Sequence, residues 1–535
     1  MLIKTYGAAV QGIDAIIVTI EVAAEKGVSF SLVGMADTAV RESHERVVSA
    51  MTQCGFSWPR RRIVVNLSPA DVRKEGAAYD LPIAIGILAA TEQIQCTHPL
   101  ESYMIMGELS LDGSVLPIRG ALPMAIKARE LGFKGMIVPQ ANVSEAAVVN
   151  NLDVYGVTSL SEVIDFFTGK KLLEPTVVNT RQEFARSSEI FDCDFSEVKG
   201  QETVKRAFEV ACAGGHNILL VGPPGSGKSM MAKRLPTILP PLTLSEALET
   251  TKIHSVAGRL KSGSRLLTSR PYRSPHHTIS PVALVGGGGN PAPGEISLAH
   301  NGVLFMDEFP EFSRQVLEVM RQPLEDRHIT ISRAKYTIDY PTGFMLVASM
   351  NPCPCGYYNH PTKECTCSPG AVQKYLNRIS GPLLDRIDLQ VEIFPVPFDS
   401  LVDKTPSEPS AAIRERVVKA RAIQNRRFNG ERLIHCNAQM THRLLSAHAQ
   451  LDRECTGILR DTMSRLDMSA RAYDRILKVA RTIADLDYAT REGFDPADEA
   501  SLSAAASSPI LSDHLYEALA YRSLDRGSWG KTTGL

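Results

Sequence analysis

The stretch HNILLVGPPGSGKSMMAKRL, His216–Leu235, decides the fold of the centre of the chain. It begins with an apolar run that is typical of a buried strand. A glycine-rich loop follows, which fits G-x-x-x-x-G-K-[ST] from Gly222 to Ser229, and a helical pattern begins directly after it. Glycines let backbone N–H groups turn toward phosphate oxygens, and the start of the helix adds a favourable dipole. The sequence therefore predicts an α/β domain that binds a nucleoside triphosphate.

Each position of the loop has an expected task. Lys228 is expected to reach the β- and γ-phosphates, and the hydroxyl of Ser229 to bind Mg²⁺. The alternative is a structural loop that matches by chance, which the flanking strand and helix make the weaker interpretation. The nucleotide-binding residues predicted on this basis are Gly222, Pro223, Pro224, Gly225, Ser226, Gly227, Lys228 and Ser229.

A second apolar run ends in two acidic residues. GVLFMDEF, residues 302–309, is expected to be a strand with Asp307 and Glu308 at its end. Asp307 can hold the metal ion through water, and Glu308 can polarise the attacking water. A solvated acidic pair after a core strand is the alternative, and it is the weaker one beside a phosphate-binding loop.

Length and composition describe a multidomain globular protein. The chain has 535 residues, with 44% hydrophobic and 22% charged residues and a net charge of −1. Because the whole chain is not basic, a polyanion must meet a local basic patch. The longest apolar run, Leu81–Ala90, is about half of what a bilayer span needs. We therefore expect a cytoplasmic protein with no membrane partner.

The pattern along the chain divides it into five parts. A mixed α/β domain comes first, then a polar linker, a second α/β domain, a helical region and a frayed tail. Their expected ranges are 1–168, 169–197, 198–397, 398–506 and 507–535, with a cysteine-rich insertion at 352–369 in the second domain.

The segment Arg270–Phe309, RPYRSPHHTISPVALVGGGGNPAPGEISLAHNGVLFMDEF, resembles the signature of the AAA+ ATPases. Within them it is most similar to the branch of the magnesium chelatase ATPase subunit and the minichromosome maintenance helicases. The resemblance implies ATP and Mg²⁺ as cofactors and a helical lid. It also implies that Asn351 is the sensor 1 residue that orients water, and that Arg386 is an arginine finger for the neighbouring subunit. Arg471 matches sensor 2, which touches the γ-phosphate from the lid.

A finger supplied by a neighbour implies a ring of subunits, because head-to-tail contacts must close. Taken alone, an arginine such as Arg386 or Arg471 is more often a surface or salt-bridge residue. Their order behind both phosphate-site motifs favours the functional interpretation.

The first domain resembles the proteolytic domain of Lon proteases through Gly107–Ala146, GELSLDGSVLPIRGALPMAIKARELGFKGMIVPQANVSEA. In that family a serine and a lysine form the catalytic pair. Here Leu122 takes the lysine's place, and no serine occurs between Ser68 and Ser102. Lys127 lies further along the same helical pattern and reads as a solvated residue. We expect a Lon-like scaffold without protease activity, as in the RadA recombination ATPase.

A Lon-like domain followed by a chelatase-type AAA+ module is the arrangement of the ComM/YifB family, which the chain resembles over nearly its whole length. The resemblance implies a homo-hexameric, ATP-driven DNA motor that acts on single-stranded and branched DNA, driving branch migration in natural transformation. A protein-remodelling ATPase like magnesium chelatase is the alternative. An ATP-dependent protease is a third class, weakened by the missing catalytic pair.

Two segments are candidates for contact with DNA. Asp326–Gly343 alternates as a β-hairpin with Arg333 and Lys335 at its tip, and such cations attract phosphates without reading bases. Ser57–Arg62, SWPRRR, places Trp58 beside three arginines. For both segments the alternative is an ordinary solvated turn.

Four of the ten cysteines lie within fifteen positions. Two close pairs separated by nine residues can give tetrahedral coordination of Zn²⁺, and the polar loop between them lacks a core of its own. His360 reads as a loop residue. Because the insertion follows Asn351 and precedes Arg386, we expect metal loss to misplace the finger, and so to weaken assembly and DNA-stimulated hydrolysis more than ATP binding. The predicted zinc ligands are Cys353, Cys355, Cys365 and Cys367.

Overall fold

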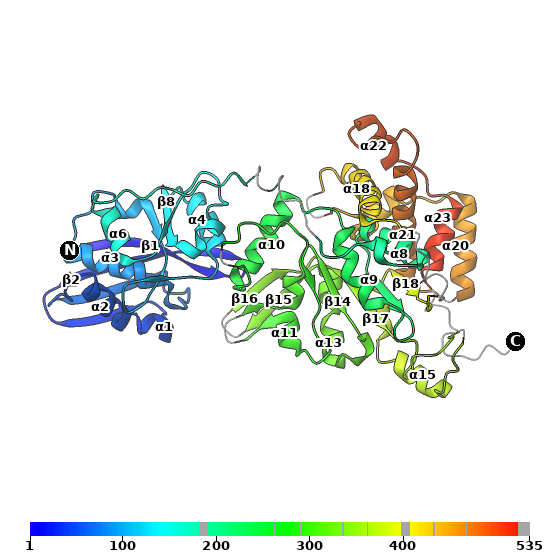
Figure 1. Ribbon diagram of the computed structural model, residues 1–535, viewed down its shortest axis with the longest axis horizontal. Coiled ribbons are helices and arrows are strands. Elements are labelled where there is room, and N and C mark those ends of the chain that lie inside the picture. Colours follow the sequence, from blue (N-terminus) through cyan, green and yellow to red (C-terminus); the bar gives the residue numbers. More distant parts are fainter. Residues whose placement is uncertain are drawn as a thin grey trace.

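The computed structural model shows an elongated molecule with three regions side by side along its long axis (Figure 1). Within the described residues no helix is long and apolar enough to cross a membrane. The structure describes residues 1–180, 184, 191–261, 263–288, 291–333, 336–360, 362–396, 407–431, 434–466 and 468–522.

The first region is built on a seven-stranded mixed sheet of order β3-β4-β2-β1-β5-β8-β9. Its pairs are antiparallel around the β1–β2 hairpin and parallel from β1 through β9. The strands are β1 Leu2–Gln11, β2 Asp14–Glu25, β3 Ser29–Val33, β4 Arg62–Ser68, β5 Tyr103–Ile105, β8 Gly135–Pro139 and β9 Asp153–Val157. Its main helices are α2 Ser43–Gln53, α3 Asp80–Ala90, α4 Ala121–Glu130 and α6 Leu160–Phe167.

The second region is a parallel sheet of five strands in the order β11-β14-β17-β10-β18. The predicted phosphate loop leaves the carboxyl end of β10, where ligands bind in open α/β sheets. The strands are β10 Ile218–Val221, β11 Tyr272–Arg273, β14 Val303–Met306, β17 Met345–Met350 and β18 Leu389–Glu392. Helices α8 Glu202–Gly214 and α9 Lys228–Arg234 flank β10 in the chain.

The third region is helical and shares one apolar cluster with α8, β10 and β18. A bidentate ion pair between Arg427 and Asp485, at 2.6 and 2.7 Å, lies inside it with both side chains fully buried. The helices are α18 Ser410–Arg427, α19 His442–His448, α20 Arg453–Leu466, α21 Ala470–Ala489, α22 Glu499–Ala506 and α23 Ser512–Ala520.

The expectation of a frayed tail from residue 507 was wrong over its first part. Helix α23 packs in the helical core, because its residues Leu515 and Ala518 are buried there, together with Ile510 just before the helix. The chain after Arg522 lies outside the described residues. The expected linker 169–197 also packs at both ends, since Thr180 donates to Val148 O at 2.9 Å and Phe195 is fully buried.

Helix α10, Leu244–Val256, and the hairpin of β15, His328–Arg333, and β16, Tyr336–Pro341, join the first two regions (Figure 1). The N–H of Gly120, at the start of α4, donates to Ser255 O at 3.3 Å. Ile13, in the β1–β2 turn, packs against the apolar cluster of the β15–β16 hairpin. The first region therefore contacts the second through packing as well as through the chain.

Candidate nucleotide site

The phosphate loop joins the buried strand β10 to the start of α9. A side chain at Gly222 is excluded, because a Cβ there would lie 2.6 Å from Ile393 O on the neighbouring strand's extension. Gly227 has a φ of +87° and directly precedes the first residue of α9. The loop backbone and the first amides of the helix therefore face the same edge of the sheet, as phosphate binding requires.

Lys228 lies over this loop. Its Nζ donates to Gly222 O at 2.7 Å, to Pro223 O at 2.9 Å and to Asn351 Oδ1 at 3.2 Å. Burial lowers the pKa of Lys228 to about 8, and the nearby carboxylates of Asp307 and Glu308 oppose that shift. The ammonium is thus held at the loop, where it can meet phosphate oxygens.

Ser229 and Asp307 meet although 78 positions separate them. Ser229 Oγ donates to Asp307 Oδ2 at 2.6 Å, and the N–H of Glu308 donates to Asp307 Oδ1 at 3.0 Å. Ser349 Oγ donates to Asp307 Oδ1. A hydroxyl and a carboxylate side by side are hard oxygen ligands of the kind that Mg²⁺ takes. The arrangement fits the predicted metal site without a change of backbone.

Glu308 has a partner that sequence reasoning missed. Its φ is +52°, and its Oε2 lies 3.4 Å from His277 Nδ1. The ring of His277 packs against that of His276 at a centroid distance of 4.1 Å. Both histidines lie in the segment Arg270–Phe309, which resembles the AAA+ signature. Their position shortly before the strand that ends in Asp307 could have indicated a role beside Glu308. His277 can orient the carboxylate that is expected to activate water.

Asn351 directly follows β17 and shares the Lys228 ammonium with the loop carbonyls. The structure thus brings together at one edge of the sheet the predicted nucleotide loop, Asp307, Glu308 and Asn351. Their assigned tasks stay predictions.

The two predicted arginines lie toward the amino-terminal ends of the strands, opposite the phosphate loop. The carbonyl of Arg386 accepts from Asn217 Nδ2 at 3.1 Å, and Asn217 directly precedes β10. The path from Asn217 to Gly222 is five residues of strand, about 16 Å at 3.3 Å per residue. The guanidinium of Arg386 is nearly buried, donates to Pro382 O at 2.7 Å and pairs with Glu325.

Arg471 lies near the same carboxylate. The hydrogen bond from Arg386, with further help from the charges of Arg471 and Arg475, lowers the pKa of Glu325. Arg475 donates to Asp388 at 2.7 Å, and the N–H of Asp388 in turn donates to Asn217 O. Arg471 thus lies within electrostatic range of the Glu325–Arg386 pair, and its expected contact with the γ-phosphate stays a prediction.

The four clustered cysteines form one site. Their Sγ atoms all lie within 4.8 Å of one another, with Cys353 at 3.3 Å from Cys355 and both at 3.6 Å from Cys365. Zn–S bonds of about 2.3 Å give tetrahedral edges of about 3.8 Å, so the four thiols fit zinc. Cys367 completes the set, and His360 is not part of it.

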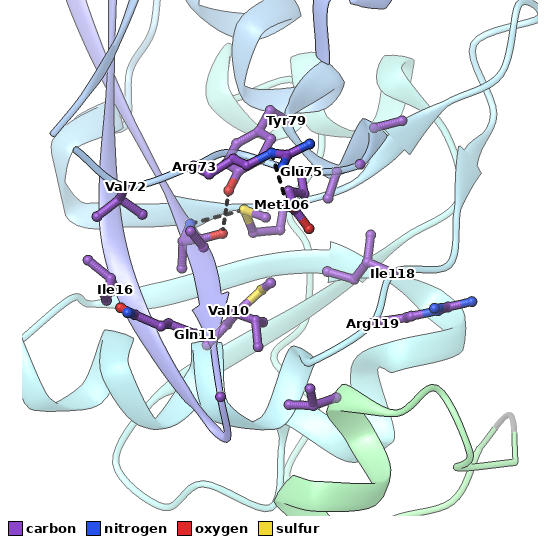
Figure 2. A pocket seen from close by; sticks show the side chains of 18 of the residues that line it. Val10, Gln11, Ile16, Val72, Arg73, Glu75, Tyr79, Met106, Ile118 and Arg119 are labelled. Atoms are coloured by element: carbon purple, nitrogen blue, oxygen red, sulfur yellow. Dashed lines mark hydrogen bonds and ion pairs between the residues drawn. The ribbon is translucent and has the colours of Figure 1, made fainter. Parts of the chain in front are cut away.

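The Lon-like region holds a cavity of about 660 Å³ between its sheet and the α10 side of the ATPase region (Figure 2). Tyr79 OH donates to Ala8 O at 3.1 Å on its wall. Ala77 and Ala78 line it, and among the described residues its lining includes no serine, threonine, cysteine or lysine. Leu122 is fully buried, and Lys127 pairs with Glu130 at 3.2 Å on the surface.

The structure describes the two segments that are candidates for DNA contact to different extents. The predicted hairpin is present as β15 and β16, but Lys335 and the side chain of Arg333 lie outside the described part. Trp58 is half-buried and packs edge-on against the rings of Phe30 and His44, with centroid distances of 5.9 and 4.9 Å. Its ring is therefore occupied by packing.

Comparison with known proteins gives three family matches. The models described as magnesium chelatase subunit ChlI, subunit ChlI of Mg-chelatase and the ChlI C-terminal part match residues 194–401, 20–142 and 407–501. The chain is 42% identical to YifB of Escherichia coli over 96% of both chains, and 41% identical to competence protein ComM of Haemophilus influenzae over 97% of both. Lon protease 2 of Bacillus subtilis is 29% identical over 127 residues, 23% of this chain.

Proposed function

Because the chain belongs to the family of YifB and ComM, we propose that it is an ATP-driven DNA motor that works as a homo-hexameric ring in the cytoplasm. Its substrates are single-stranded and branched DNA, and its task is branch migration during recombination and natural transformation. The chain carries a magnesium chelatase-like AAA+ ATPase region, a Lon-like first region and a helical third region.

The observation that carries the proposal is the placement of the charges. Lys228, Ser229 and Asp307 lie at one edge of the sheet, and Arg386 lies at the other. A finger that cannot reach its own ATP serves a neighbour's, which requires a closed ring. In the site, Lys228 binds phosphate and Glu308 polarises the water. Ser229 and Asp307 hold Mg²⁺, which neutralises charge on the phosphates when bound.

DNA is supported by the name of ComM as a competence protein and by the β15–β16 hairpin beside β17. The alternative is a protein-remodelling ATPase, which the magnesium chelatase matches favour. We further propose that Cys353, Cys355, Cys365 and Cys367 hold one Zn²⁺, which the spacing of their Sγ atoms fits.

Steady-state ATP hydrolysis with and without single-stranded DNA tests the proposal, followed by a branch-migration assay on a synthetic four-way junction. The motor predicts stimulation by DNA and ATP-dependent movement of the junction. Hydrolysis that ignores DNA, with no movement of the junction, would refute the DNA motor and favour the remodelling ATPase. Lys228→Ala, which removes the phosphate-binding ammonium, is the control for contaminating ATPases.

A further inference from the structure

The cysteine loop touches the phosphate loop. A Cβ at Gly356 would lie 2.5 Å from Pro224 Cδ and 2.8 Å from its Cγ, far closer than any real contact, and 3.9 Å from Asn351 Cγ. The bare backbone of Gly356 therefore packs directly on the ring of Pro224 and beside Asn351. Gly356 follows the ligand Cys355, and its N–H donates to Cys353 O at 3.0 Å. The turn that carries two of the four thiols is thus one wall of the phosphate loop.

Most of the described residues of the insertion around this turn are partly or fully exposed. Among the described residues between Pro352 and Gly370, only Pro352, Cys353 and Gly356 are buried. One further contact of the insertion is local, with Lys363 Nζ 4.8 Å from the centroid of the Tyr357 ring. A segment without an apolar core takes its folding energy from its metal. The position of Gly356 against Pro224 therefore depends on the cross-link between the two cysteine pairs.

We infer that a metal ion in the four-cysteine site braces the phosphate loop, so that metal occupancy sets the affinity of the protein for ATP. This rests on the proposed function, since it assumes that the loop binds ATP. It departs from the expectation that metal loss weakens assembly and DNA-stimulated hydrolysis more than ATP binding, because the insertion lies against the phosphate loop and not only between Asn351 and Arg386. If the braced loop is populated in about a tenth of metal-free molecules, the apparent Kd for ATP rises about tenfold.

The test is titration of the full chain with a fluorescent ATP analogue in zinc-loaded, chelator-treated and zinc-reloaded protein. Zinc per chain is measured by elemental analysis and folding by circular dichroism. We expect about a tenfold weaker Kd after chelation and recovery after reloading. Unchanged affinity in metal-free, folded protein would overturn the inference while leaving the ATPase proposal intact. Failure of the zinc-loaded protein to bind ATP would overturn the ATPase proposal itself.

Two glycine variants distinguish the effect of the contact with Pro224 from the effect of metal loss. Gly356→Ala keeps all four thiols but drives a methyl group into Pro224, whereas Gly493→Ala imposes the same backbone strain, since both glycines have a φ of +84°, with nothing within 4 Å of the added Cβ. We expect Gly356→Ala to retain zinc and lose about tenfold in ATP affinity, and Gly493→Ala to match the wild type. Equal affinities of the two variants would contradict the brace.

Discussion

Replacement of Arg386 by alanine tests the central step of the proposed mechanism, in which each subunit completes the ATP site of its neighbour. Arg386 lies by Asn217 at the start of β10, and the phosphate loop begins at its end, about 16 Å away along the strand. The substitution leaves Lys228 and Ser229 in place, so the Kd for ATP should not change. Turnover should fall by about 10³-fold, as expected for the loss of an arginine finger.

Mixing two inactive variants gives a quantitative prediction for the recovered ATPase activity. In a ring assembled from equal amounts of Arg386→Ala and Lys228→Ala, a working interface needs an intact loop from the first variant beside an intact finger from the second. In random assembly, about one interface in four has an Arg386→Ala subunit supplying the loop and a Lys228→Ala subunit supplying the finger. Activity should therefore recover to about a quarter of the wild-type value.

Steady-state phosphate release from co-purified, differently tagged subunits measures the recovery. The matched control is Arg491→Ala, because Arg491 makes an exposed ion pair with Asp487 in the lid, 2.8 Å long, that should matter little to catalysis. A mixture no more active than the mean of its two parents would refute the reasoning, since it would mean that Arg386 acts within its own chain or only in folding.

Four further predictions concern single groups. Glu308→Gln should bind ATP but not hydrolyse it, because only the water-polarising charge is lost, and normal turnover would exclude that role. His277→Ala should lower kcat about tenfold at unchanged ATP affinity, whereas His276→Ala, one position away, should not; equal effects would refute a positioning role. The affinity for ATP should fall about tenfold between pH 7 and pH 9. The pKa of Lys228 is about 8, so its charged form is lost as the pH rises through that value. An affinity that does not change with pH would contradict the lowered pKa. Casein with ATP should stay uncut, and labelling of residues 1–168 by a serine-reactive probe would reopen the protease interpretation.

The sequence was sufficient to predict the parts of the fold whose signals are local. The run before Gly222 and the run before Asp307 are buried strands, β10 and β14, because short apolar runs bounded by turn signals suit a parallel sheet. The chelatase-like, Lon-like and helical parts of the fold class are confirmed. Sequence pattern was less decisive at Leu81–Ala90, which belongs to the fully buried helix α3 and so shows no apolar stripe at all.

The remaining features depend on contacts between distant segments. Nothing in GPLLDRIDL, residues 381–389, says that Arg386 lies at the start of β10 and not at its end; the strand order decides it. Gly356 reads as a turn glycine, and only the packing of two loops shows why a methyl group is excluded there. Helix α23 is short, and its apolar positions become meaningful once α20 and α21 are in place.

The Lon-like region has a structural task that its missing catalytic residues do not affect. Lys252 of α10 pairs with Asp14 at 3.1 Å, and Ser255 of the same helix donates to the buried Glu145. On the other side a Cβ at Gly12 would meet Ile338 of β16 at 2.9 Å, so the β1–β2 turn lies directly on the hairpin that is proposed to contact DNA. The hairpin is therefore packed from the side by the first region. A Lon-like fold supplies that surface whether or not it carries a nucleophile, so the scaffold can serve the proposed motor without protease activity.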